Sequence, residues 1–389
     1  MDASDPGGSR RLCHSVKGVA MWASPLHLCD RYSPQQIQEI DNMAIPKVPD
    51  FDSLPEVEGM PQGCAWGLFD KDGKKDLLGT LNLLTPDVIK GACAEARDGV
   101  SISLNWPLNA MGFPLPGRIQ PIHKQMTLKE TGLSEGAGWD DEIHFNTQLS
   151  SQWDSLVHWH HQPSSLAYNG IEVTKEGLAA ANTASNAMPT LDHWHAAGGL
   201  VARGVLIDFK EWAEKKARAE GKSGDDVVVH PLDGHRITVD EIETIAKDQG
   251  VEFRPGDVLI VRTGLTEYLQ APTPEVFAKL QNQKISGVHG TIESAKWLWN
   301  KQFAAVAGDA WAFEALPPLK EDGSLATHLD LVLHPWLLAM FGMPIGELWD
   351  LGALSAHCKV SGRYSFMLTS APLHIPGLIG SPPNALAVF

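Results

Sequence analysis

The hydrophobic and polar positions of the chain predict an alternation of strands and helices that begins near residue 45. Strands are predicted at the apolar runs that glycine, proline or polar residues bound, namely 100–106, 199–209, 255–264, 303–310 and 363–373. Helices are predicted where apolar positions recur at helical spacing, at 239–250, 291–302 and the start of 334–354. Because the connections between these elements are short, the pattern indicates an α/β domain with a large β component.

Two further helices are predicted from their ends and their charge. Thr85 followed by Pro86 is typical of a helix N-terminus, and the helix that it opens is expected to end near Gly99. The apolar residues just before Thr85 predict a strand or turn. The segment 211–226 is charged throughout, which favours a solvated helical insertion. After the helix that opens 334–354, a Pro-Ile turn predicts a short strand or loop.

The first 45 residues differ from the rest because they lack sustained periodicity. Only 33–44 has a helical pattern, with Ser33 as its N-cap. We therefore expect residues 1–45 to form an extension or arm and residues 46–389 to form a single domain.

Composition limits the partners of the protein. With 31 Lys and Arg against 47 Asp and Glu, the formal net charge is −16, which disfavours binding to nucleic acid. No apolar run reaches the ~18–20 residues that a membrane helix needs. The five cysteines form no CxxC pair, and the N-terminus has no continuous apolar signal region. The expectation is a cytoplasmic protein that binds neither membrane nor nucleic acid.

Chemically capable side chains are densest in the segment 146–162. Gln148, Gln152, Asp154 and His158 are all even-numbered, so they share one face if the segment is extended. A straight strand would place the two glutamines about 13 Å apart, at roughly 3.3 Å per residue. Both can reach one ion only if the chain bends between them, and the two serines at 150 and 151 are compatible with a bend.

From spacing alone, a buried polar strand whose amides are satisfied by hydrogen bonds explains this cluster equally well. The remaining histidines in similar settings are interpreted as structural or surface residues: His123, His144, His160, His161, His193 and His195. The sequence GLSEG formally fits the nucleophile motif G-x-S-x-G at Ser134. Its flanks are polar and rich in glycine, which predicts a loop rather than a strand–turn–helix elbow.

The cluster resembles the motif of the metal-dependent cyclase family, which includes kynurenine formamidases, isatin hydrolases and a lactone-hydrolase branch. The family pattern His-x-Gly-Thr-His-x-Asp-x-Pro-x-His falls on Gln148-Leu-Ser-Ser-Gln152-Trp-Asp154-Ser-Leu-Val-His158. The aspartate and the last histidine match, whereas glutamines replace both earlier histidines, as in a long-chain branch of the family. Segments similar to the family follow in the expected order: 76–89, 168–170, 202–209, 255–264, 305–317, 333–351 and the C-terminus.

The resemblance implies a fold and a metal site. The fold would be α/β, of the swivelling β/β/α type, with a β-barrel-like mixed sheet core and surrounding helices. A downstream histidine and glutamate complete the family's metal site, and by position these resemble His334 and Glu347, with one residue more between them than is usual. The predicted ligands are therefore Gln148, Gln152, Asp154, His334 and Glu347. Family members also form homodimers or homotetramers.

The two glutamines change the expected metal chemistry. An amide oxygen is a harder and weaker ligand than imidazole, so the set favours Mn²⁺ over Zn²⁺. The alternative is a site that has lost its metal and a protein that only binds a ligand.

By resemblance, the function is metal-dependent hydrolysis of an amide, ester or lactone bond, with His158 as the general acid and base. A cyclase, isomerase or dehydratase of secondary metabolism on the same fold is a second alternative. The substrate would be a small molecule. Four tryptophans near the candidate ligands could line an aromatic pocket, although core packing is their default role: Trp153, Trp159, Trp311 and Trp336.

Overall fold

A computed structural model describes residues 48–389, apart from 114–116, 271–272 and 321. Residues 44–389 group together by their contacts into one compact unit. The predicted arm (1–45) and its helix (33–44) lie outside the described residues, and the boundary at residue 45 stays a prediction.

A nine-stranded mixed sheet, curled into a half-barrel, forms the centre of the fold, in the order β1-β13-β11-β5-β7-β9-β10-β4-β12. Its strands are β1 (Ser101–Ser103), β4 (Gln152–Asp154), β5 (Leu200–Asp208), β7 (Val258–Arg262), β9 (Ala305–Gly308), β10 (Ile345–Glu347), β11 (Ser365–Ser370), β12 (Gly380–Ser381) and β13 (Leu386–Val388). Strands β5, β7, β9 and β10 are parallel, and the outer pairs are antiparallel. The predicted fold, a mixed sheet core with helices around it, is confirmed.

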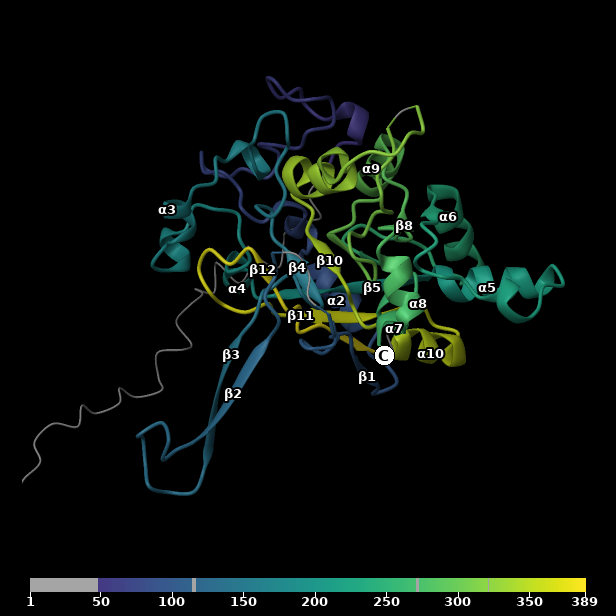
Figure 1. Cartoon of the computed structure of the whole chain (residues 1–389). Coiled ribbons are helices and arrows are strands. Elements are labelled where there is room, and N and C mark those ends of the chain that lie inside the picture. The colour runs from purple at the N-terminus through teal and green to yellow at the C-terminus, as the bar shows by residue number, and fades with distance from the viewer. Residues whose placement is uncertain (1–47, 114–116, 271–272, 321) are drawn as a thin grey trace, which may run out of the picture. The chain divides into compact units, whose positions relative to one another are not determined.

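Helices connect and cover these strands (Figure 1). They are α2 (Pro86–Cys93), α3 (Lys175–Leu178), α4 (His193–Ala196), α5 (Phe209–Ala219), α6 (Val239–Asp248), α7 (Leu265–Leu269), α8 (Pro274–Leu280), α9 (Ile292–Asn300) and α10 (Gly352–Ser361), with a π-helix η8 (Pro335–Phe341). The remaining strands form two separate two-stranded sheets. One pairs β2 (Ile122–Thr127) with β3 (Trp139–His144), and the other pairs β6 (Arg236–Ile237) with β8 (Gly287–Val288). Helices α2 and α6 contact β5, and α5 contacts β7.

The central strands are apolar throughout because both faces of the sheet are covered. On β7, Leu259 and Val261 pack into one hydrophobic cluster, together with residues of α6, α9 and η8. Val258 and Ile260 point the other way, into a second cluster that includes α10 and the C-terminus. This alternation is the period of two that a strand imposes on its side chains.

Most of the predicted elements are present, and the differences lie at their ends. Thr85 accepts a hydrogen bond from the Val88 amide and opens α2, but this helix ends at Cys93, well before Gly99. The charged helix α5 likewise ends at Ala219, just before Gly221 at φ +84°.

The segment before Thr85, where a strand or turn is predicted, is a short 3-10 helix, η3 (Gly79–Leu83). Gly79 has φ +59°, and a Cβ atom there would lie 1.9 Å from the carbonyl oxygen of Gly342. The close approach of these two backbones therefore requires a glycine.

The β2–β3 hairpin extends away from the rest of the domain (Figure 1). Its side chains are almost all exposed on both faces, including Trp139 at 75 % and Ile122 at 59 %. Ser134 lies in the loop that joins its strands, so the predicted loop is confirmed.

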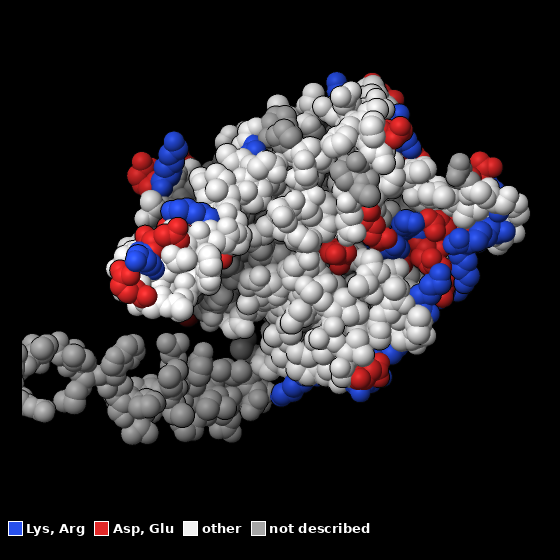
Figure 2. Space-filling model, turned by 60° about the horizontal axis from the view of Figure 1, so that its bottom comes forward, with Lys and Arg blue, Asp and Glu red and all other residues white. Residues whose placement is uncertain are grey.

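The surface charge of the protein is unevenly distributed. On the face in Figure 2, charged side chains gather at the margins, and most of the central surface is uncharged. Among the described residues, no helix is both long enough and apolar enough to cross a bilayer.

Candidate functional site

Two neighbouring strands position the first side chains of the site. Strands β4 and β10 are antiparallel, with Gln152 opposite Glu347 and Asp154 opposite Ile345. Because side chains alternate along a strand, Gln152, Asp154 and Glu347 lie on the same face of the sheet. Trp153 and Gly346 point to the opposite face, where the Trp153 ring contacts the rings of Trp194 and Trp349.

The chain turns immediately before β4, as the spacing of the glutamines required. Residues 147–151 form turns and bends, so only Gln152–Asp154 of the predicted extended segment is a strand. The Nε2 of Gln152 donates to the Oε1 of Gln148 at 2.7 Å and to the Oε2 of Glu347 at 2.8 Å. Gln148 in turn donates from Nε2 to the Oδ1 of Asp154. The two glutamines thus link both carboxylates in one buried network.

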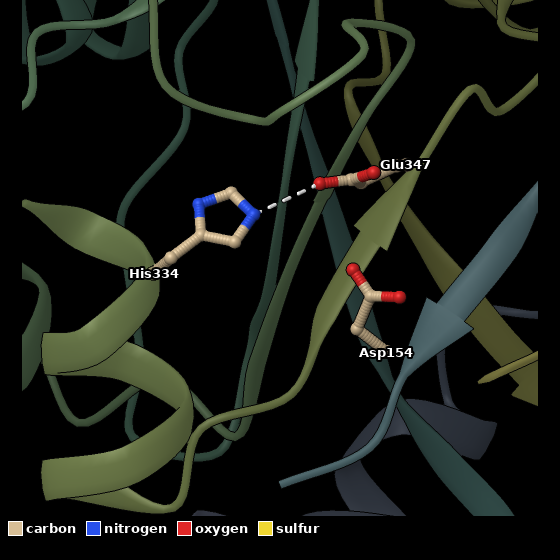
Figure 3. A group of neighbouring side chains, drawn as sticks. All are labelled: Asp154, His334 and Glu347. Carbon is tan, nitrogen blue, oxygen red and sulfur yellow. Dashed lines mark ion pairs between the residues drawn. The ribbon is translucent and has the colours of Figure 1, made fainter. Parts of the chain in front are cut away.

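His334 completes the group from a distant part of the chain. It is the N-cap residue of η8, and its Nε2 lies 3.3 Å from the Oε1 of Glu347. Figure 3 shows His334, Glu347 and Asp154 gathered from η8, β10 and β4. One ligand atom from each of the three lies within 4.8 Å of the others, and all three residues are buried. Within the described part of the chain, this is the one such group of histidine, cysteine and carboxylate side chains.

A buried glutamate that the sequence did not single out holds His334 from its other side. The Oε1 of Glu314 lies 3.0 Å from the Nδ1 of His334 and accepts from its backbone amide at 2.9 Å. The Oε2 of Glu314 accepts from the backbone amide of Val332 at 3.0 Å. A histidine that donates its Nδ1–H to a carboxylate presents Nε2 as the free ligand atom, and this is the usual arrangement behind metal-bound histidines.

Burial and close charges shift the ionisation of the site. Burial alone would lower the pKa of His334, but its hydrogen bonds with Glu314 and Glu347 raise this pKa well above its usual range. Burial and the neighbouring Asp154 carboxylate raise the pKa of Glu347. The imidazole of His334 thus lies between two carboxyl groups, with one facing each ring nitrogen.

The residues present fit a cation. Among the described residues, the Oδ2 of Asp154 and the Oε1 of Gln152 are buried oxygens without a hydrogen-bond partner. An unpaired buried acceptor is costly unless an ion, a water molecule or a ligand contacts it. Oxygen atoms of this kind, beside the Nε2 of His334, suit a divalent metal ion.

His158 lies at the edge of this group rather than within it. Its Nδ1 is 4.0 Å from the Oδ1 of Asp154, and its side chain is 22 % exposed. Burial lowers the pKa of His158; Asp154 opposes this shift, and His334 and Arg118 add to it. The neutral imidazole, which can accept a proton, is therefore favoured at neutral pH.

A cavity of about 910 Å³ opens onto the group. Its polar lining consists of Arg118, Gln148, His158, Gln281, Gln283, His328, His334 and Glu347. Its apolar lining consists of Phe113, Trp159, Phe277, Leu280, Ile285, Trp311, Ala312, Leu316 and Leu331. Of the four tryptophans proposed for an aromatic pocket, Trp159 and Trp311 line the cavity. Trp153 and Trp336 are in the hydrophobic core.

The structure therefore brings all five predicted ligands into one network and places His158 beside it; their roles as ligands and acid/base stay predictions. The other histidines make local contacts elsewhere, for example His195 with the carbonyl of Pro372 at 2.7 Å. Glu314 and Arg118 were not predicted. Glu314 lies in 305–317, one of the segments similar to the family, whereas nothing in the sequence around Arg118 marks it.

Comparisons with known proteins give a family and a fold. A sequence profile of the cyclase family, described as "Putative cyclase", matches residues 84–315. This range contains Gln148, Asp154, His158 and Glu314, but it ends before His334 and Glu347. Comparison with curated proteins finds no match.

Among solved structures, the chain is similar to one described as a novel cyclase, with 29 % identity and a TM-score of 0.66, over 84 % of this chain and 99 % of that one. It is also similar to an isatin hydrolase bound to the product analogue thioisatinate, with 14 % identity and a TM-score of 0.50. The match covers 78 % of this chain and 98 % of the isatin hydrolase chain. Isatin hydrolase A from Labrenzia aggregata, bound to benzyl benzoate, shows 16 % identity and a TM-score of 0.48. The match covers 77 % of this chain and 97 % of that one. The likeness to the thioisatinate-bound enzyme establishes a shared fold. Because the profile match covers more than half of the sequence, the protein belongs to the cyclase family.

Proposed function

We propose that the protein is a metal-dependent hydrolase that cleaves an amide, lactone or ester bond next to a carbonyl in a small molecule. One observation carries the proposal: three buried ligand atoms of Asp154, His334 and Glu347 lie within 4.8 Å of one another, and His334 and Glu347 line a cavity of about 910 Å³. A cluster of this kind at the end of a largely apolar cavity is typical of a catalytic site.

Asp154, Glu347 and the Nε2 of His334 would hold the ion. Glu314 keeps the imidazole oriented by accepting its Nδ1–H. Gln148 and Gln152 already contact the same carboxylates, and the unpaired Oε1 of Gln152 would be available to the same ion. A ligand set with so many oxygens favours Mn²⁺ over Zn²⁺.

A bound divalent ion supplies polarisation of the substrate carbonyl and lowers the pKa of a water molecule. His158 accepts a proton from the attacking water as the new C–O bond forms. When the C–N or C–O bond breaks, His158 returns this proton to the leaving nitrogen or oxygen, so that the histidine ends each turnover neutral. The products are a carboxylic acid and an amine or alcohol, which remain joined when the substrate is a ring.

The experiment is a comparison of metal-stripped and Mn²⁺-reconstituted protein on a panel of N-formyl amines, lactones and cyclic imides. We expect turnover only with metal, and a product that has gained the mass of one water molecule. Undiminished turnover without metal would exclude the proposal. A product of unchanged mass would instead indicate an isomerase, and a product that has lost water would indicate a cyclase or dehydratase.

A metal-free binding protein is the second candidate, and a specific observation favours it. The amide groups of Gln148 and Gln152 donate to Asp154 and Glu347, so protein donors already satisfy part of the carboxylate charge. Elemental analysis of the protein purified from cells grown with Mn²⁺ separates the candidates. About one equivalent of metal supports the hydrolase, and none supports the binding protein.

A further inference from the structure

Among the described residues, one cation in the cavity lacks the carboxylate partner that the two buried arginines of the sheet have. The half-buried Arg118 lines the cavity together with Glu347 and His158. Its Nη1 donates to the backbone carbonyl of Gln148 at 2.5 Å. In the described part of the chain, no carboxylate lies within ion-pairing distance of its guanidinium.

The buried arginines of the sheet are bound differently. Arg203 donates from Nε and Nη2 to both oxygens of Asp257, at 2.9 and 2.7 Å. Arg262 donates to both oxygens of Glu267 in the same forked manner, at 2.8 and 2.9 Å. A guanidinium offers five N–H donors in a plane that matches a carboxylate. Toward the residues that the structure describes, Arg118 uses only the Nη1 donor.

Neither carboxylate of the site forms a direct ion pair with Arg118, whose charge acts on Glu347 only at longer range and opposes the rise in the pKa of that residue. Asp154 accepts from Gln148, while Glu347 accepts from Gln152 and pairs with His334. Their hydrogen bonds are thus directed into the buried network and away from the guanidinium. A partly desolvated cation with free donors attracts an anion from solution more strongly than an exposed one does.

The rest of the cavity is suited to a bulky apolar molecule. Phe113 and Phe277 meet edge to face, with 5.3 Å between ring centroids, and form part of the wall. Trp159, Trp311 and Leu316 contribute further apolar lining. At about 910 Å³, the cavity lies near the top of the ~300–1,000 Å³ range of small-molecule sites.

We propose that Arg118 binds a carboxylate that the substrate carries in addition to the carbonyl under attack. The substrate class is then a bulky apolar acid that contains an amide, ester or lactone group, which rests on the proposed function. A carboxylate fits better than a phosphate because, among the described residues that line the cavity, Arg118 has no second lysine or arginine beside it. One guanidinium balances one monoanion.

The test measures binding of a matched pair of probes, 4-(1-pyrenyl)butanoate and its neutral primary amide, by fluorescence titration of the purified, metal-containing protein. We expect the wild-type protein to bind the acid more tightly than the amide by about tenfold or more. R118Q should remove this preference and leave the Kd of the amide unchanged. R118K should keep only part of it, because an ammonium group cannot form the planar fork.

The control variant is K124Q, which removes the same charge from the exposed hairpin outside the cavity. It should bind both probes as the wild-type protein does. The proposal is overturned if neither probe binds, if the wild-type protein does not distinguish them, or if R118Q still prefers the acid. If R118Q still prefers the acid and this preference is lost when the metal is removed, the carboxylate of the probe binds at the metal and not at Arg118.

Because this experiment needs no turnover, its failure is distinct from failure of the proposed function. Selective binding without hydrolysis on the substrate panel would retain the anion site and reject the hydrolase. Hydrolysis by a protein that does not select the acid probe would instead retain the hydrolase and reject the anion site.

Discussion

Glu347 lies directly opposite Gln152 in the antiparallel pair of β10 and β4, and the Nε2 of Gln152 donates a hydrogen bond of 2.8 Å to its carboxylate. This pairing fixes which side chains face the cavity, because a shift of one residue would turn every side chain of a strand to the other face. Gly346, the neighbour of Glu347, packs closely against Ala307 and Trp349, so that no larger side chain fits there. The sheet register therefore sets the geometry of the carboxylates.

Replacing both glutamines by histidine should change metal preference. The variant Q148H/Q152H adds two imidazole nitrogens to the carboxylate pair, and such ligands suit Zn²⁺ better than amide oxygens do. We expect the ratio of Zn²⁺ to Mn²⁺ affinity to rise by about tenfold or more, measured by competitive titration. The control is Q270H, on an exposed glutamine after α7, which should leave the ratio unchanged. An unchanged ratio in the double variant would mean that neither glutamine is a ligand.

Removing the charge of Glu314 should weaken metal binding without unfolding the protein. In E314Q, a neutral amide replaces the carboxylate that accepts from the Nδ1 and backbone amide of His334. Loss of such a partner typically lowers metal affinity by about 10–100-fold. Calorimetric titration with Mn²⁺ measures the effect, and circular dichroism reports the fold. E243Q, on a partly exposed glutamate that pairs with Lys301, is the matched control. Wild-type affinity in E314Q would argue that His334 does not bind the metal.

The pH dependence of turnover should reflect His158. A lowered pKa means that this histidine loses its proton at lower pH than an ordinary histidine, so the base form is present throughout the neutral range. We expect kcat/KM to be level near pH 7 and to fall only below the usual histidine value of about 6.5.

The variant H158N tests this assignment. It should lower kcat by roughly 10²–10⁴-fold and remove the acid limb, with metal content unchanged. If the acid limb persisted in H158N, another group would be the base.

Much of the fold could be predicted because its elements are encoded locally. The apolar runs at β5, β7 and β9, and the capping threonine Thr85, each specify their own conformation. The turn before β4 is different. The Oγ of Ser151 donates to the carbonyl of Leu348 at 2.8 Å and accepts from the amide of Trp106 at 2.6 Å. Spacing showed that a bend was necessary, but the contacts that hold it come from distant parts of the chain.

The same reason explains which site residues were missed. Asp154 and His158 belong to a compact motif, whereas Glu314 acts only through His334, twenty residues further along the chain. Arg118 reaches the site because the turn at Gln148 exposes a backbone carbonyl to it. Relationships of this kind exist only in the folded sheet, and local sequence patterns do not record them.

Trp153, which lies between Gln152 and Asp154 in β4, should be important for stability. Trp153 is fully buried, and its Nε1 donates to the Oγ of Ser370 at 2.9 Å. W153F removes this hydrogen bond and leaves unfilled volume, so the free energy of unfolding should fall by about 1–3 kcal/mol in denaturant titrations. W139F, on a tryptophan that is 75 % exposed, should change it by less than about 0.5 kcal/mol. Equal effects of the two substitutions would contradict this role.

The two halves of the buried network lie far apart along the chain, since Gln152 and Glu347 are separated by 195 residues. An ion can therefore not organise a short stretch of unfolded chain around itself, as it does in a zinc finger. The sheet must first bring β4 and β10 together, and closing so long a loop is a late and slow event in folding. Newly made protein should consequently fold before it takes up metal, and the metal available to the finished protein, rather than to the nascent chain, would decide which ion occupies it.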